Sequence, residues 1–179
     1  MNTFTRNLLI GAAAGLAATW IKSRTEPSLQ EVGEKIYPPK PGELELIGAD
    51  ITRKPENTPY ALVAGDFYED LTGEPLSRDA KIRTMKCIRY AMGTGVGITY
   101  VSLVNPIKFL RIGNGATAGA LVWAISKGSV LPKLGLQPKA NQMPKSWWVW
   151  EIGSHLAFGI MMEQSRRLLT AVFKKRKRS

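Results

Sequence analysis

The chain has 179 residues, of which 44% are hydrophobic and 22% are charged, and its formal net charge is +11. A single cysteine excludes an internal disulfide, and a single histidine argues against a zinc site built within the chain. The positive charge alone is compatible with nucleic-acid binding, but no nucleic-acid-binding motif accompanies it. We therefore expect neither a metal nor a nucleic-acid partner.

Charged residues are unevenly distributed along the chain. Twelve of the fourteen acidic residues lie between Glu26 and Asp79, and seven of the 25 basic residues lie between Arg166 and Arg178. The mean hydropathy of −0.11 is therefore an average over a charge-rich first half and a more apolar second half.

Four apolar stretches are each close to the roughly 20 residues that a helix needs to cross a bilayer. All are diluted by glycine, alanine and threonine, and three carry a charge inside or near an end, namely Lys22, Arg89 and Lys127. They lack the regular polar face of an amphipathic helix. The sequence therefore predicts an all-α membrane protein, a four-helix transmembrane bundle with spans at about residues 4–22, 87–104, 113–131 and 147–163. A cleaved secretory signal is the alternative for the first stretch.

Small residues recur at helical spacing within three of these stretches. Such residues let helix backbones approach closely. The predicted packing residues are Gly11, Gly15, Gly93, Gly97, Ala116, Gly119 and Ala120.

Residues 23–86 form a long connection between the first two predicted spans. Prolines at positions 38, 39 and 41 mark turns, and residues 28–37 and 60–71 are expected to be helical. We expect this loop to be extracytoplasmic and partly helical.

Basic residues indicate an orientation. The tail, residues 166–179, predicts that both termini are cytoplasmic in a bacterial cytoplasmic (inner) membrane, although the connection between the third and fourth spans carries three lysines of its own. Trp147, Trp148 and Trp150 are expected to anchor the fourth span at the outer surface. The alternative is a tryptophan cluster in a protein core.

Two pairs of ionisable residues lie four apart, Lys22 with Glu26 and Glu151 with His155. This spacing places each pair on one helix face. The four residues are predicted to form a buried polar cluster that either fixes helix register or handles protons or a ligand. Further along, Glu163, Arg166 and Arg167 form a predicted ion-pair group at the end of the last span, where they act as interface anchors.

No motif in the sequence carries recognisable catalytic chemistry. The run Gly-Thr-Gly-Val-Gly at residues 93–97 superficially suggests a dinucleotide loop, but no strand precedes it and helix packing explains it better. We predict no catalytic residue, no cofactor and no metal ligand.

Three stretches of the chain resemble one protein family. They are Gly11-x2-Ala14-Gly15 followed by Lys22 and Glu26; Val96-Gly97 through Pro106-Ile107-Lys108 and residues 115–121 to Leu134-Gly135-Leu136; and Glu151-Ile152-x2-His155-Leu156 followed by Glu163, Arg166 and Arg167. Together they make roughly 100 residues similar to the YagU-like bacterial inner-membrane proteins. The resemblance implies a small four-span protein and supplies no reaction.

The leading functional prediction is a non-enzymatic membrane protein that acts by association with other membrane components, as an accessory subunit of a larger complex. Weakly hydrophobic spans rich in small residues favour protein neighbours, so the predicted partners are the lipid bilayer and other membrane subunits or a second copy. The alternative is a proton-linked or small-solute transporter that uses Lys22, Glu26, Glu151 and His155.

Overall fold

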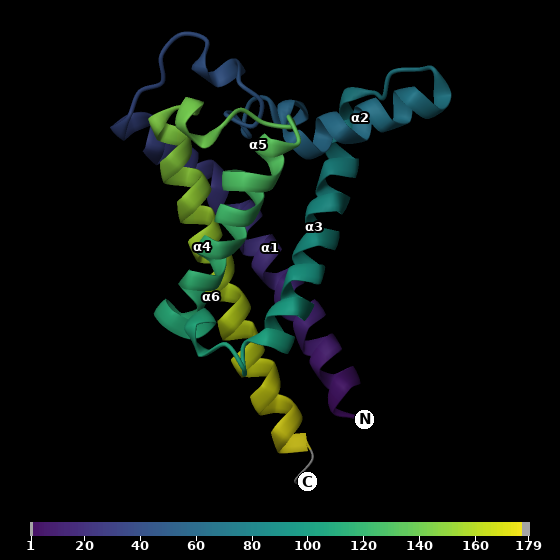
Figure 1. Cartoon of the computed structure of the whole chain (residues 1–179), viewed down its shortest axis with the longest axis vertical. Helices are drawn as coiled ribbons and strands as arrows, with labels where there is room; N and C mark the ends of the chain where they lie inside the picture. The colour runs from purple at the N-terminus through teal and green to yellow at the C-terminus, as the bar shows by residue number, and fades with distance from the viewer. Residues whose placement is uncertain (1, 177–179) are drawn as a thin grey trace. The chain divides into compact units, whose positions relative to one another are not determined.

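The computed structural model describes residues 2–176, and side chains up to residue 174 (Figure 1). Every regular element in this range is helical, which confirms the all-α prediction for the described residues. In chain order the elements are α1 (Thr3–Ile36), η1 (Glu43–Glu45), η2 (Pro55–Asn57), α2 (Pro59–Thr72), α3 (Arg78–Leu103), η3 (Lys108–Gly115), α4 (Ala116–Ile125), η4 (Ser126–Val130), α5 (Leu131–Lys133), η5 (Ala140–Gln142) and α6 (Lys145–Arg176).

Local sequence explains where two of the helices begin and end. The Asn2 side chain accepts a hydrogen bond from the Thr5 backbone N–H at 2.7 Å, which satisfies a free donor in the first turn of α1. Helix α2 has Pro59 in its first turn, where the missing N–H costs nothing. It ends at Gly73, whose φ of 74° is left-handed and whose N–H donates to the Glu69 carbonyl at 2.8 Å.

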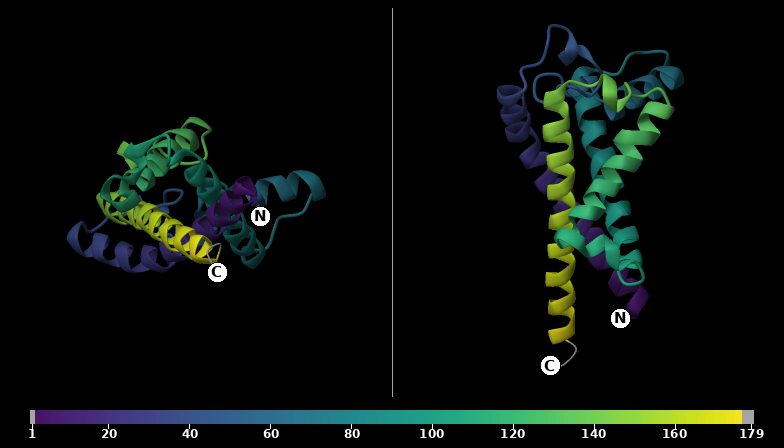
Figure 2. Two further views of the ribbon diagram at one scale, coloured as in Figure 1. Left: turned by 90° about the horizontal axis from the view of Figure 1, so that it is seen from below. Right: turned by 60° about the vertical axis from the view of Figure 1, so that its left-hand side comes forward.

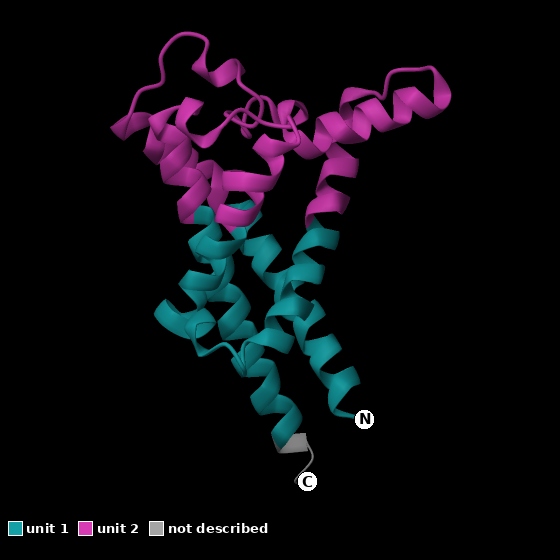
Figure 3. Ribbon diagram, viewed as in Figure 1, with its two compact units in different colours: residues 1–24, 90–122, 154–179 teal, residues 25–89, 123–153 magenta. Residues whose placement is uncertain are grey.

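The chain forms two compact units, which are coloured separately in Figure 3. Unit 1 comprises residues 1–24, 90–122 and 154–179, and unit 2 comprises residues 25–89 and 123–153. Each unit is described by itself below.

Unit 1 is held together by close contact between helix backbones. A Cβ atom added to Gly97 of α3 would lie 2.2 Å from the Gly11 carbonyl oxygen of α1, and one added to Gly15 would lie 2.2 Å from the Gly93 carbonyl oxygen. Helices α4 and α6 meet in the same way, because a Cβ on Gly119 would lie 2.0 Å from the His155 carbonyl oxygen. Glycine is therefore the residue that both contacts require.

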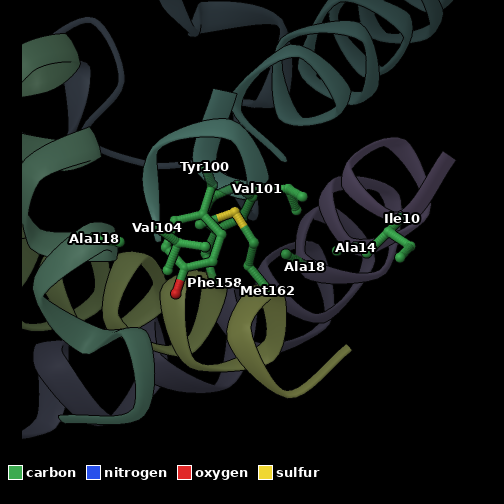
Figure 4. Close-up of a cluster of buried hydrophobic side chains, with 9 residues drawn as sticks. All are labelled: Ile10, Ala14, Ala18, Tyr100, Val101, Val104, Ala118, Phe158 and Met162. Carbon is green, nitrogen blue, oxygen red and sulfur yellow. The ribbon is translucent and has the colours of Figure 1, made fainter. Parts of the chain in front are cut away.

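Around these contacts the unit 1 core combines small and aliphatic side chains with two aromatic ones and one methionine (Figure 4). Its buried members are Ile10, Ala14, Ala18, Tyr100, Val101, Val104, Ala118, Phe158 and Met162.

The core of unit 2 is dominated by tryptophans. Trp147 and Trp150 are fully buried with Ala49 and Met143, and the partly buried Trp123 and Trp148 pack against them. Neighbouring indole rings lie 5.5–6.4 Å apart in tilted or edge-on arrangements, which are favourable geometries for aromatic pairs. The predicted belt of tryptophans at a membrane surface is thus a packed core, the alternative weighed from the sequence.

The predicted location in the bacterial cytoplasmic membrane, with several passes and both ends cytoplasmic, is wrong. Among residues 2–176, no helix combines the length and the apolar content that a membrane crossing requires. The physical reason is the composition of the segments, in which small and charged residues replace the large apolar side chains of a span.

The predicted segment boundaries also differ from the observed helices. Residues 4–22 lie in α1, which continues to Ile36, so residues 28–37 do not start a helix of their own. Residues 113–131 contain the end of η3, then α4, then a π-helical turn in η4. The expected extracytoplasmic loop supplies most of unit 2, and its second predicted helix, residues 60–71, corresponds to α2. In the predicted basic tail, residues 177–179 lie outside the described residues.

Candidate functional site

The four residues of the predicted polar cluster fall into both units. Lys22 and His155 belong to unit 1, whereas Glu26 and Glu151 belong to unit 2. Glu26, Glu151 and His155 are buried, with at most 4% of each residue exposed.

In unit 1, Lys22 reaches a residue that the sequence analysis did not consider. Its Nζ donates a hydrogen bond to the Ser154 hydroxyl at 2.7 Å, which ties α1 to α6. Ser154 directly precedes His155, whose carbonyl oxygen faces Gly119 of α4. Lys22 therefore contributes to helix packing in the region where three helices of unit 1 come together.

In unit 2, Glu26 binds Arg89 of α3. The two carboxylate oxygens of Glu26 accept from one guanidinium nitrogen of Arg89 at 2.5 and 2.6 Å. Burial by itself would lower the pKa of Arg89, but the charge and hydrogen bonds of Glu26, together with the charge of Glu151, raise it overall. Glu26 and Arg89 are 63 residues apart, so no local spacing in the sequence pointed to this pair.

Tyr60 of α2 lies near the same charges. Burial raises the pKa of the Tyr60 phenol, the charge of Glu151 raises it further, and Arg89 opposes the shift. Lys127, on the π-helical turn η4, lies over the Tyr60 ring at 5.6 Å from its centroid and donates to Gln137 at 3.2 Å. Tyr60 thus lies near the charges of Glu151, Arg89 and Lys127 in unit 2.

A second polar group in unit 2 fixes the segment after α1. The buried carboxylate of Asp50 accepts from the Gln30 side chain at 2.8 Å and from the Arg53 backbone and guanidinium at 3.0 and 2.5 Å. Arg53 also donates to Glu34 at 2.5 Å. Burial alone would raise the pKa of Asp50, but these hydrogen bonds lower it overall.

Glu163, predicted to be part of an ion-pair group, is the centre of a buried network in unit 1. Its two oxygens accept hydrogen bonds from Arg166 at 2.6 and 2.8 Å, from Arg167 at 2.6 Å and from the Tyr100 hydroxyl at 2.8 Å. Burial would raise the pKa of Glu163, yet these hydrogen bonds and the charge of Arg166 lower it to about 2. Tyr100 responds in the opposite direction, because burial and Glu163 raise its pKa.

The residues predicted to pack helices together do not all lie at close helix contacts. Gly11, Gly15, Gly93 and Gly97 all lie at the crossing of α1 and α3. In α4, Gly119 makes the close contact with α6, whereas Ala116 and Ala120 are only half-buried. The sequence analysis missed Gly115 and Gly159, which meet where a Cβ on Gly159 would lie 2.3 Å from the Gly115 carbonyl oxygen. The spacing Gly115-x3-Gly119 was the signal that could have found the first of them.

Acidic residues such as those in these polar groups can also serve as metal ligands. In the part of the chain that the structure describes, no group of three or more His, Cys, Asp or Glu side chains is placed to hold a metal ion. The carboxylates of Glu26, Asp50 and Glu163 accept hydrogen bonds from arginines, so cationic partners compensate these buried charges.

The outer face of α1 in unit 1 presents an apolar row to its surroundings. Leu9, Ala13, Leu16 and Trp20 are exposed and follow one another at spacings of four, three and four residues, which places them on one side of the helix. Half of Trp20 is exposed, and the guanidinium of Arg24, one turn further, lies 5.6 Å from its ring centroid. The opposite side of α1 carries the glycines that pack on α3. We call this row the α1 face.

A second apolar row lies on α2, whose C-terminal half projects away from the other helices of unit 2 (Figures 1 and 2). Val63, Phe67 and Leu71 are four residues apart, and Phe67 and Leu71 are 65% and 69% exposed. Asp66 and Asp70 run alongside them, and α2 contains no basic residue. We call Val63, Phe67 and Leu71 the α2 face.

Comparison with protein families, with curated proteins and with solved structures finds no match for this chain. The resemblance to the YagU-like proteins therefore stays a prediction from the sequence.

Proposed function

We propose that this protein is a non-enzymatic helical subunit that acts by binding other proteins, as an accessory component of a larger assembly. The observation that carries the proposal is the α1 face. Its four residues cover roughly 16 Å along the helix axis at 1.5 Å per residue. Contiguous apolar rows of this kind mark interaction sites, because monomeric proteins rarely leave them uncovered.

The buried polar groups support a structural role for the interior. The arginine-bound carboxylates of Glu26, Asp50 and Glu163 join helices or loops within their own units. Association through exposed helix faces is the function for which the structure offers a positive argument.

The test is the size of the particle that contains the protein in an extract of its native cells. We expect the wild-type chain to elute well above its 19.7 kDa monomer mass. The double variant Leu16→Ser/Trp20→Ser should shift to the monomer position, since two exposed anchors of the contact are lost.

Leu168→Ser is the matched control, because Leu168 is 66% exposed on α6 and lies outside the α1 face. It should leave the particle unchanged, and far-UV circular dichroism should confirm that both variants keep their helix content. A wild-type monomer in the extract, or a large particle that survives the double variant, would contradict the proposal.

A further inference from the structure

We infer that the α2 face of one copy of this chain binds the α1 face of a second copy. The inference rests on the proposed function and names the partner that the α1 face accepts. Both faces are rows of exposed apolar side chains on single helices. The α2 face covers roughly 12 Å along its axis, which fits within the roughly 16 Å of the α1 face.

Charge favours the pairing of an α1 face with an α2 face over the pairing of two α1 faces or two α2 faces. In residues 3–24 of α1 the charged side chains beside the α1 face are Arg6 and Arg24, and this stretch has no acidic residue. Lys22 lies on the packed side of the helix, where it binds Ser154. Helix α2 carries Asp66, Glu69 and Asp70 and no basic residue. Two α1 faces or two α2 faces would bring like charges together, which is unfavourable in a contact, whereas an α1 face and an α2 face bring opposite charges together.

In each row the charged side chains lie beside the apolar ones, so they would border the contact. Arg24 follows Trp20 by one turn on the α1 face and lies over its ring. Asp66 and Asp70 are each three residues beyond a member of the α2 face, so they form a parallel row beside it. When the apolar rows pack together, the carboxylates border the contact and Arg24 meets them at its end.

Each copy offers one face of each kind. Reciprocal pairing of two copies closes a dimer, and one-way pairing extends into a chain of copies. In either arrangement the contact joins unlike surfaces, and this property can be tested without knowing which arrangement forms.

The experiment uses two purified full-length variants, Leu16→Ser/Trp20→Ser, which disables the α1 face, and Phe67→Ser/Leu71→Ser, which disables the α2 face. Light scattering is measured during gel filtration over a range of protein concentrations. The wild type should associate to at least twice its 19.7 kDa mass, and each variant alone should be monomeric. An equal mixture of the two should associate again, because each supplies the face that the other lacks.

Self-association of either variant alone would overturn the inference, since it would reveal pairing of like faces. A wild type that stays monomeric at every concentration would also overturn it. In that case the native particle decides the proposed function. If the Leu16→Ser/Trp20→Ser variant loses the large native particle, the proposed function stands and the α1 face binds a different partner. If the native particle is unchanged in that variant, the inference and the proposed function are both contradicted.

Charge reversal gives an independent readout in variants whose apolar rows are intact. Asp66→Lys/Asp70→Lys should weaken association about five- to tenfold, as should Arg24→Glu, and mixing these two variants should recover most of the loss. Glu31→Lys is the control, because Glu31 is exposed, is bound by Lys35 and belongs to neither row. Equal weakening by the control would show that net charge, and not the proposed contact, controls association.

Discussion

The two units of this protein fill their interiors differently, although both contain a glycine where helices approach closely. In unit 2 this is Gly33, where an added Cβ would lie 2.7 Å from the Ser146 carbonyl oxygen. Unit 1 contains twelve basic residues and one acidic residue, and its helices touch backbone to backbone at glycines. Unit 2 contains thirteen of each charge, so the whole net charge of +11 belongs to unit 1, and its core is built from four tryptophans. Glycine-rich helices therefore indicate close helix packing, whatever surrounds the helices.

The largest effect is expected when a side chain is inserted at a glycine contact of unit 1, which tests whether backbone contact holds its helices together. Gly97→Leu should destabilise the protein by about 4 kcal/mol or more, because its Cβ would lie 2.2 Å from the Gly11 carbonyl oxygen and neither backbone can move aside cheaply. Chemical denaturation followed by circular dichroism measures the change.

The control is Gly95→Ala on the same helix. An added Cβ at Gly95 meets nothing within 4 Å, so the variant should gain about 0.5–1 kcal/mol from helix propensity. A Gly97→Leu variant as stable as the wild type would show that the backbone contact is not what holds α1 to α3.

In unit 2 the corresponding test removes a large side chain from the tryptophan core. Trp147→Ala should cost about 3–4 kcal/mol, because a fully buried aromatic side chain leaves a cavity among Trp123, Trp148 and Trp150. Leu134→Ala, at a residue 65% exposed, should change the free energy of unfolding by less than about 0.5 kcal/mol. Thermal unfolding of both variants measures the two losses of stability. Similar losses in Trp147→Ala and Leu134→Ala would indicate a surface cluster and not a packed core.

A smaller effect is expected at the buried ion pair of unit 2. Arg89→Met should cost about 3 kcal/mol, since it removes the guanidinium that donates to both oxygens of the buried Glu26 carboxylate. The double variant Glu26→Leu/Arg89→Met should recover most of that loss, because the charge is then removed with its partner. Urea denaturation of the single and double variants measures the recovery, and equal losses in both would point to a role beyond charge compensation.

The smallest expected effect is a pH dependence in unit 1. The pKa of Glu163 is lowered from its ordinary value of 4.5 to about 2, so its contribution is fully present above pH 4.5 and is lost as the pH falls toward 2. The full shift corresponds to about 3.4 kcal/mol, and solvent screening at the half-exposed Arg167 reduces the expected loss to about 2 kcal/mol. Glu163→Gln should be less stable than the wild type at pH 6, and the difference should shrink between pH 4.5 and 2.5. A constant difference would contradict the assigned cause.

Sequence reasoning predicted the helical class, the α2 segment and the glycines at the crossing of α1 and α3, because each depends on local spacing. It did not predict the Glu26–Arg89 and Tyr100–Glu163 contacts, whose members are 63 residues apart. It misjudged the surroundings of the helices, because small residues at helical spacing are equally suited to packing in lipid and in a protein interior. The same ambiguity applied to Trp147 and Trp150, whose burial only the folded structure decides.

The crossing of α1 and α3 also limits how this sequence can change over time. Gly11 and Gly15 face Gly93 and Gly97, so both sides of the contact already use the smallest residue available. A larger residue on one side cannot be accommodated by a smaller one on the other, because none exists. The four positions therefore leave evolution no pair of compensating substitutions, and homologous chains that keep this crossing are expected to retain glycine at all four.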